Sequence, residues 1–236
     1  VTKADREVLY ELDGKPALDV YRRFVNIDRN DKFFSNTLEF PLFLEHDGID
    51  ILRCPLAAND DDSLVMSSDM QEGADVRLAY GDPETILASI REDGQKIADF
   101  CPEVIQTFSC AARRAFWGDE NISDETILFN SVAPTTGFYT HGEFLRINGD
   151  MLNFNVTLVI VAMREGDMPQ TGQRVNIAKA QIDKDNTEKI PIIRRFVSFI
   201  EASTAELEEM NMKLALSSVT DGLTRLYNRA EIERKI

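Results

Sequence analysis

Short strand patterns and short helix patterns follow one another along residues 1–180 without a regular repeat. Alternating apolar residues predict strands, and apolar residues three and four apart predict helices. A doubly wound parallel sheet requires a regular alternation of the two, so we expect an α+β fold instead. The predicted architecture is a mixed or antiparallel sheet with flanking helices, followed by a long C-terminal helix.

The predicted strands are bounded by residues that favour turns. Asp13 and Gly14 predict a tight turn, Asp47 and Gly48 predict a β-hairpin, and the sequence 148–150 predicts another turn. The expected strands lie at residues 7–12, 38–44, 49–56, 63–67, 75–80, 104–110, 138–147 and 152–163.

The predicted helices of the same region begin at recognisable caps. Asp82 is placed as an N-cap with Pro83 at the first helical position, and Ser123 is placed as the N-cap of a later helix. The expected helices lie at residues 16–27, 82–101, 111–117 and 123–130.

The composition excludes several classes of partner. The chain has 41 acidic and 26 basic residues, a net charge of −15, which repels nucleic acid and anionic lipid. Its longest apolar run, residues 156–163, has the length of a strand, so no membrane insertion is expected. Three cysteines without a CxxC pair and two histidines make a zinc site hard to assemble and indicate reduced thiols in the cytoplasm.

Apolar residues recur every seventh position after residue 183, which is typical of a coiled-coil seam. The seam predicts a homodimer through the C-terminal helix, and Asn211 within it would weaken the pairing. The alternative is an ordinary amphipathic helix that packs on its own domain. The seam positions are Ile193, Ile200, Leu207 and Leu214.

Residues 221–229, with the sequence DGLTRLYNR, resemble the DxLTxLxNR opening of GGDEF domains. The resemblance implies that the parent protein is a diguanylate cyclase, which makes cyclic di-GMP from two GTP molecules with Mg²⁺. The active-site loop of that family does not occur in this sequence. We therefore expect no catalytic residue, no metal site, no cofactor and no cyclase activity in this chain. The matching positions are Asp221, Leu223, Thr224, Leu226, Asn228 and Arg229.

Three further segments resemble the C-terminal half of FIST sensory domains. They are residues 10–21 (YELDGKPALDVY), 108–113 (FSCAAR) and 137–143 (GFYTHGE). The resemblance implies a cytoplasmic sensor for a small molecule, for example one of amino-acid-like chemistry. It also implies that the family's N-terminal half is not part of this sequence. The expected organisation is a sensor domain at 1–182, a signalling helix at 183–219 and the start of a GGDEF domain at 220–236, in a natural protein that extends at both ends.

Two of these segments supply the candidate ligand-binding side chains. Arg113 could hold a carboxylate with two hydrogen bonds, and Glu143 could accept an ammonium group, so the pair suits a zwitterion. The alternative is a structural ion pair between Arg113 and Glu143. The complete predicted set is Cys110, Arg113, Phe138, Tyr139, His141 and Glu143.

Two residues of this set allow other chemistry. Cys110 could act as a nucleophile, although a free cysteine is more often a small core residue. His141 could be a haem ligand, because some FIST proteins resemble haem-linked gas sensors. Three functions are therefore open: a ligand-sensing regulatory module, a dimerisation module without a ligand, and a haem-linked sensor.

Overall fold

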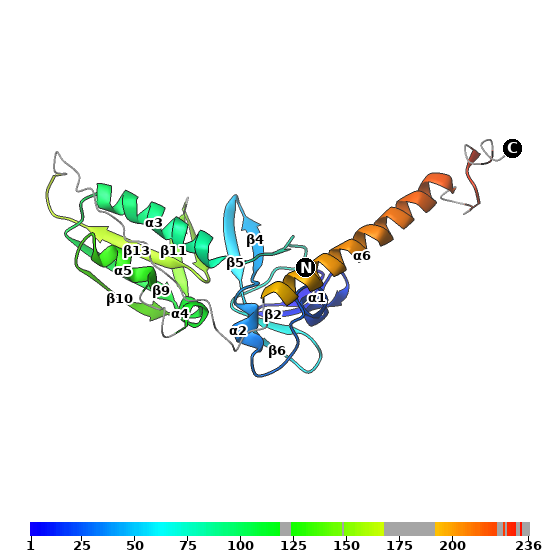
Figure 1. Ribbon diagram of the computed structural model, residues 1–236, viewed down its shortest axis with the longest axis horizontal. Coiled ribbons are helices and arrows are strands. Elements are labelled where there is room, and N and C mark those ends of the chain that lie inside the picture. The colour runs from blue at the N-terminus through cyan, green and yellow to red at the C-terminus, as the bar shows by residue number, and fades with distance from the viewer. Residues whose placement is uncertain are drawn as a thin grey trace. The chain divides into compact units, whose positions relative to one another are not determined.

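The computed structural model describes residues 1–118, 124–147, 149–167, 192–220, 224, 226–229 and 232. It confirms the α+β class, with several small sheets, flanking helices and a long C-terminal helix (Figure 1). The chain divides into two compact units, one formed by Val1–Leu18 with Asp28–Lys189 and the other by Asp19–Ile27 with Ile190–Ile236. The predicted boundary between residues 182 and 183 lies outside the described residues.

The N-terminal residues of the first unit form an antiparallel sheet with the order β1-β2-β7-β6. The predicted turn at Asp13 and Gly14 is confirmed, because both have a positive φ, of 51° and 71°, and β3 returns from this turn to pair with β2. The strands are β1 (Lys3–Asp5), β2 (Val8–Leu12), β3 (Lys15–Pro16), β6 (Pro55–Ala58) and β7 (Leu64–Met66).

A second antiparallel sheet contains the predicted hairpin. Asp47 and Gly48 have φ values of 50° and 77°, which suit a tight hairpin turn between two strands. The predicted strand at 49–56 is wrong in its length, because the chain changes sheets at Cys54. The three strands are β4 (Leu42–His46), β5 (Ile49–Arg53) and β8 (Arg77–Leu78), in the order β5-β4-β8.

The predicted strand at 38–44 begins four residues too early, because a short helix precedes it. Helix α2 (Phe33–Thr37) buries Phe33, and the Thr37 hydroxyl donates to the carbonyl oxygen of Pro55 at 2.8 Å. This long-range hydrogen bond fixes the end of the helix against β6. The contact depends on residues distant in sequence, so local alternation could not predict it.

The third sheet combines a parallel and an antiparallel pair and carries three helices on one face. Helix α3 begins as predicted, because the Asp82 carboxylate accepts a hydrogen bond from the Thr85 backbone N–H at 2.8 Å. The predicted 104–110 strand and 111–117 helix are confirmed. The elements are β9 (Val104–Cys110), β10 (Thr135–Thr140), β13 (Leu158–Met163), α3 (Pro83–Asp99), α4 (Ala111–Trp117) and α5 (Asp124–Asn130), with β9 in the centre of the sheet (Figure 1). Ser123, the predicted cap, lies outside the described residues.

The helices cover the sheet through one continuous apolar core. Ile105 of the central strand β9 is fully buried in it, and Leu158 and Ile160 of β13 pack against it. The helices contribute Leu87, Ile90, Phe116, Trp117, Leu128 and Phe129 to the same core.

Two predicted long strands are wrong, since each is divided between two sheets. The chain leaves β10 after Thr140 and starts β11 (Glu143–Ile147), which pairs with β12 (Asp150–Phe154) as an antiparallel hairpin around the predicted turn. A second break separates β12 from β13 at Val156, whose positive φ of 59° is strained for a β-branched residue.

The second unit pairs helix α1 (Ala17–Val25), from Asp19 onward, with the long helix α6 (Ile192–Val219). Arg23 forms an ion pair with Glu206 at 3.0 Å, and the rings of Phe24 and Phe199 lie 6.1 Å apart. The helix predicted at 16–27 is confirmed to within two residues. None of the helices described for this chain is long and apolar enough to cross a membrane.

Helix α6 has one buried face and a different apolar face that is exposed. Ala202 lies on the buried face and is 8% exposed, while Ile200, Leu207 and Leu214 are 62%, 61% and 59% exposed. The predicted seam is therefore separate from the face that packs within the unit. The side chain of Ile193, the first seam position, lies outside the described residues.

Candidate functional site

The carboxyl ends of the parallel strands β9 and β10 bring two predicted site residues together. Cys110 ends β9 and Thr140 ends β10, and the two residues are paired in the parallel register. Glu143 follows as the first residue of β11. This edge of a parallel sheet is where ligands commonly bind, because the chain turns there and leaves side chains and backbone groups directed outward.

Glu143 is a buried carboxyl group with an incomplete set of hydrogen bonds. Its side chain is 3% exposed, and one oxygen accepts a hydrogen bond from the Thr140 hydroxyl. Within the part of the chain that the structure describes, the other oxygen, Oε2, has no hydrogen-bond partner. Burial raises the pKa of Glu143, and hydrogen bonding from Thr140, Cys110 and the Thr157 backbone, together with the charge of Arg113, only partly offsets this effect.

Cys110 is 5% exposed and lies beside this carboxyl group. Burial raises the pKa of the thiol, and the negative charge of Glu143 raises it further. A thiol must lose its proton to attack an electrophile, so this environment favours an inert cysteine over a nucleophile. Cys54 is likewise buried, and its pKa is raised to about 12.

Arg113 is held by a partner that sequence reasoning did not identify. Its Nε lies 2.8 Å from Oε1 of Glu125 on α5, and its NH1 donates to the Val156 carbonyl oxygen at 2.9 Å. The predicted structural alternative, an Arg113–Glu143 ion pair, is therefore wrong in its partner.

Glu125 is the centre of a buried polar cluster on the helix-covered face of the sheet. It accepts hydrogen bonds from the Ser109 hydroxyl at 3.2 Å and from the Trp117 indole N–H, in addition to Arg113. A sequence signal for this burial did exist. Glu125 is three and four residues before Leu128 and Phe129, so all three lie on one helix face.

The remaining predicted site residues do not join the buried carboxyl group. Phe138 is 57% exposed and contacts the ring of Phe108 edge-on at 5.1 Å between centroids. Tyr139 lies under the Arg114 guanidinium at 5.7 Å from the ring centre, and its pKa is raised mainly by burial. His141 is exposed between β10 and β11, which gives no support to a haem-binding role.

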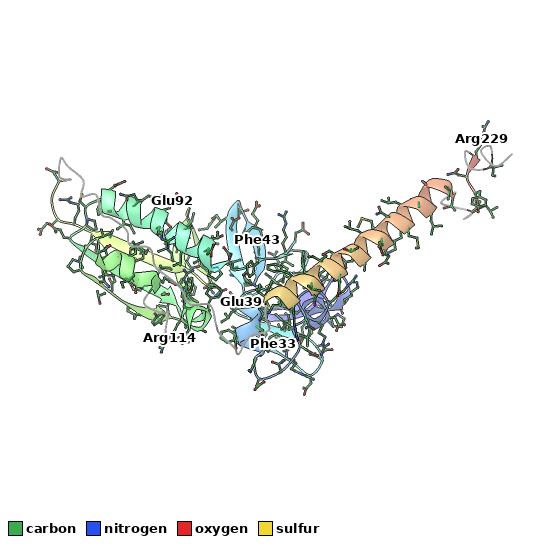
Figure 2. The ribbon with its side chains drawn as sticks, viewed as in Figure 1. Phe33, Glu39, Phe43, Glu92, Arg114 and Arg229 are labelled. Atoms are coloured by element: carbon green, nitrogen blue, oxygen red, sulfur yellow. The ribbon has the colours of Figure 1, made fainter. Side chains whose placement is uncertain are left out.

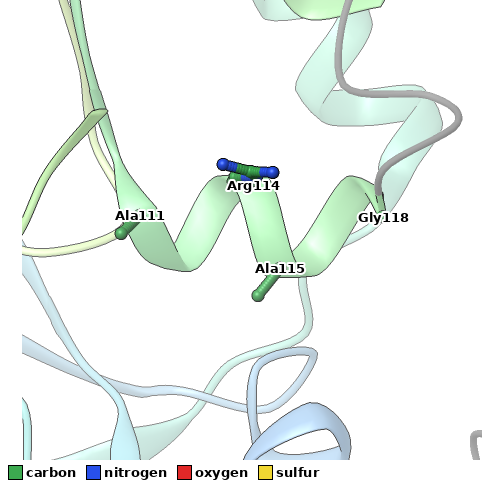
Figure 3. Close-up of a pocket in the computed structure, with 4 residues that line it drawn as sticks. All are labelled: Ala111, Arg114, Ala115 and Gly118. Carbon is green, nitrogen blue, oxygen red and sulfur yellow. The ribbon is translucent and has the colours of Figure 1, made fainter. Parts of the chain in front are cut away.

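An open hollow of about 350 Å³ lies on the outer side of α4 (Figure 3). Its lining residues are Ala111, Arg114, Ala115 and Gly118, and Arg114 is also labelled in Figure 2. Neither Glu143 nor Cys110 lines it, so this hollow and the buried carboxyl group are separate features. No group of His, Cys, Asp and Glu side chains that could hold a metal ion occurs among the described residues.

The residues of the GGDEF-like motif that are described fold back on the end of α6. The Asn228 side chain donates to the Ser218 carbonyl oxygen at 2.7 Å, and its backbone N–H donates to Val219 at 2.8 Å. Thr220 and Tyr227 form an antiparallel bridge. These bonds satisfy carbonyl groups that a helix end leaves unpaired.

The other described positions of the GGDEF-like motif are Thr224, Leu226 and Arg229. Thr224 accepts a weak hydrogen bond from the Leu226 backbone N–H, and the Leu226 side chain is 69% exposed. Arg229 lies beyond the end of α6 (Figure 2). Asp221 and Leu223 lie outside the described residues.

The FIST C domain family model matches residues 17–146, which include all six predicted ligand-binding positions. Comparisons with curated proteins and with solved structures gave no match. The FIST domain is a signal-sensing domain, which agrees with a sensory and regulatory role for the matched region. Because the match covers more than half of the sequence, this chain belongs to the FIST C domain family.

Proposed function

We propose that this chain is the ligand-sensing and signal-transducing part of a cytoplasmic diguanylate cyclase and controls its synthesis of cyclic di-GMP. The observation that carries the proposal is the attachment of the GGDEF-like motif to the end of α6 through Asn228. A stiff helix that ends in such a clamp can pass a rotation or shift to the domain after it. The chain itself contributes no catalytic residue and works as the regulator.

The buried carboxyl group of Glu143 is the proposed centre of ligand recognition. Its Oε2, which accepts no hydrogen bond from the described residues, is an acceptor that a ligand N–H group would satisfy, and a buried acceptor without a donor costs stability. An ammonium group also returns Glu143 to its charged form by supplying an opposite charge. The proposed ligand is thus a small amino-acid-like molecule whose ammonium group faces Glu143.

Arg113 has a different role in this proposal from the one that the sequence indicated. It already neutralises Glu125, so a ligand carboxylate would have to share the guanidinium group with that residue. Glu143 therefore carries the specificity for the ammonium group, and Arg113 positions the end of β9 on which Cys110 lies.

Helix α6 is the proposed transmission element. Two copies pair in parallel through Ile200, Leu207 and Leu214, whose side chains are exposed in the single chain. Asn211 keeps this seam weak, which allows more than one register within a few kcal/mol. A ligand that changes how α1 holds α6, through contacts such as Arg23–Glu206, would select one register.

An experiment on the full-length protein distinguishes a ligand sensor from a dimerisation module that binds no ligand. The exposed seam of α6 is compatible with both functions. The full-length protein should make cyclic di-GMP from GTP and Mg²⁺, and an active amine from a metabolite panel should change the rate. Glu143→Gln should remove that response and leave the basal rate. Absence of cyclic di-GMP synthesis contradicts the cyclase assignment, and a rate that no metabolite changes favours the dimerisation module.

A further inference from the structure

Among the described residues, helices cover only one face of the β10-β9-β13 sheet. Ile105, Thr107 and Ser109 point toward the helices and are at most 5% exposed. Because side chains alternate along a strand, the residues between them point to the opposite face. Parallel strand pairs are normally covered on both faces, so it is unusual that no helix described for this chain covers the second face of this sheet.

We define the open sheet face as the outward side chains of these three strands. The strand register aligns Phe108 of β9 with Phe138 of β10 and with Val159 of β13, so all three lie on this face. At the carboxyl end of β9, Glu143 of β11 lies beside Cys110 and marks the limit of the open sheet face. The apolar members are Val104, Phe108, Phe138, Val159, Val161 and Met163, and the polar members are Gln106 and Thr136.

The open sheet face is both apolar and exposed. Phe138 is 57% exposed, Met163 is 40% exposed and Val161 is 39% exposed. Single exposed apolar residues are common on protein surfaces, but a contiguous group across three strands marks an interaction site.

The open sheet face also carries no charge, although the chain as a whole has a net charge of −15. Two copies of so acidic a chain repel one another over most of their surfaces. On the open sheet face the outward residues carry only uncharged hydrocarbon, thioether, amide and hydroxyl groups. This face is therefore a place where a second copy can approach without bringing like charges together.

We propose that the open sheet face binds the open sheet face of a second copy of this chain. The packing is sheet on sheet, with a two-fold axis along β9. Rotation about this axis places β10 of one copy opposite β13 of the other. The protruding Phe138 ring then lies against the smaller Val159 of the partner, which is at the same level in the strand register, and the two-fold axis produces this contact twice.

A three-stranded face is small compared with the roughly 800 Å² that each partner buries in a stable interface. The isolated contact should therefore be weak and should dissociate on dilution. It becomes effective when another contact, such as the α6 seam, already holds the two chains together and raises their effective concentration. The two contacts involve different residues, so each can be tested without the other.

The first test measures molecular mass by light scattering over a dilution series in the Leu207→Asp background, which disables the α6 seam. We expect the Leu207→Asp chain to associate as its concentration rises. The double variant that also carries Phe138→Asp should remain a monomer at the same concentrations. Ile127→Asp is the matched control, because Ile127 is 56% exposed but lies on α5, on the helix-covered side. Circular dichroism establishes that all three variants fold.

Two results would overturn the proposal. The first is a Leu207→Asp chain that stays monomeric at every concentration, which would assign the open sheet face to a different partner. The second is an equal association of the Phe138→Asp and Ile127→Asp variants. Both results leave the proposed cyclase function untouched, since that function is measured as cyclic di-GMP output.

The second test detects the predicted pairing by disulfide crosslinking. In a Cys101→Ser background, a mixture of Phe138→Cys and Val159→Cys chains should form a crosslinked dimer under mild oxidation. Within one chain these positions lie on either side of β9, about 10 Å apart, which is too far for a disulfide. In the control mixture, an Ile127→Cys chain takes the place of the Phe138→Cys chain. Equal crosslinking in the two mixtures would contradict the proposed face-to-face packing of the sheets.

Discussion

The guanidinium Nε of Arg113 lies 2.8 Å from the carboxylate of Glu125, with the two side chains 12% and 3% exposed. This ion pair joins α4 to α5 beneath the end of β9. Ser109 and Trp117 complete the hydrogen bonds of the carboxylate, so the pair is satisfied as well as buried. Its function is to hold in place the sheet edge on which Cys110 and Thr140 lie.

Removing the positive member of this pair should destabilise the first unit. Arg113→Ala leaves the buried carboxylate of Glu125 without its counter-charge, and we expect a loss of about 3–5 kcal/mol in the free energy of unfolding. The measurement is urea unfolding followed by circular dichroism. Arg114→Ala is the control on the same helix and should cost about 1 kcal/mol or less, because the Arg114 side chain is exposed and its cation–π contact with Tyr139 is weak there. Equal losses for the two variants would contradict a structural role for Arg113.

The pKa of Glu143 predicts how stability depends on pH. A carboxyl group whose folded-state pKa is raised binds protons more tightly when folded, so its contribution to stability is complete below the ordinary pKa of glutamate. That contribution is lost as the pH rises from this value through the raised pKa of the folded state. Glu143→Gln keeps a neutral side chain and should remove this loss.

The check on Glu143 is the difference in unfolding free energy between Glu143→Gln and the natural chain, measured at several pH values in that window. The difference should move in favour of the variant as the pH rises. Glu45→Gln, the same substitution at an exposed position of β4, is the matched control. A difference for Glu143→Gln that does not change with pH would show that the carboxyl group is not perturbed by its burial.

Gly137 tests the close approach of the two parallel strands. A Cβ atom at this position would collide with the backbone and side chain of Thr107 on β9, so Gly137→Ala should force the strands apart and cost about 1–3 kcal/mol. At Gly142 an added Cβ would meet its nearest atoms at 3.5 Å, an ordinary contact, so Gly142→Ala should cost far less. Thermal unfolding of both variants decides the point, and similar melting temperatures would refute the steric argument.

Local signals in the sequence predicted the elements whose ends depend on nearby residues. The Asp82 cap, the Asp47–Gly48 turn and the junction between β9 and α4 are of this kind, because each is fixed by residues next to one another. The division of residues 138–147 between two sheets could not be predicted in this way. It depends on which strand each half pairs with, and alternation within a strand does not encode its partner.

The candidate site was predicted in part for the same reason. Glu143 and Cys110 were both named as site residues, from two different family segments, and the parallel pairing of β9 and β10 and the start of β11 bring them together. The partner of Arg113 was missed, because a glutamate early in a polar helix turn usually faces solvent. The spacing of Glu125 from Leu128 and Phe129 was the available signal that Glu125 is buried. In this helix that spacing outweighs the general preference of glutamate for the surface.

The last prediction concerns transmission through α6. Leu207 is exposed on the seam, so Leu207→Asp places a charge where two helices meet and should shift the protein toward monomer and lower its cyclic di-GMP output. Asn211→Leu should tighten the seam and reduce the response to ligand, because one register then dominates. Met212→Asp is the matched control, since Met212 is 67% exposed but lies on another side of the helix. Light scattering gives the mass of each variant and nucleotide analysis of the full-length protein gives its output. If Leu207→Asp and Met212→Asp behave alike in both measurements, the helix does not signal through this seam.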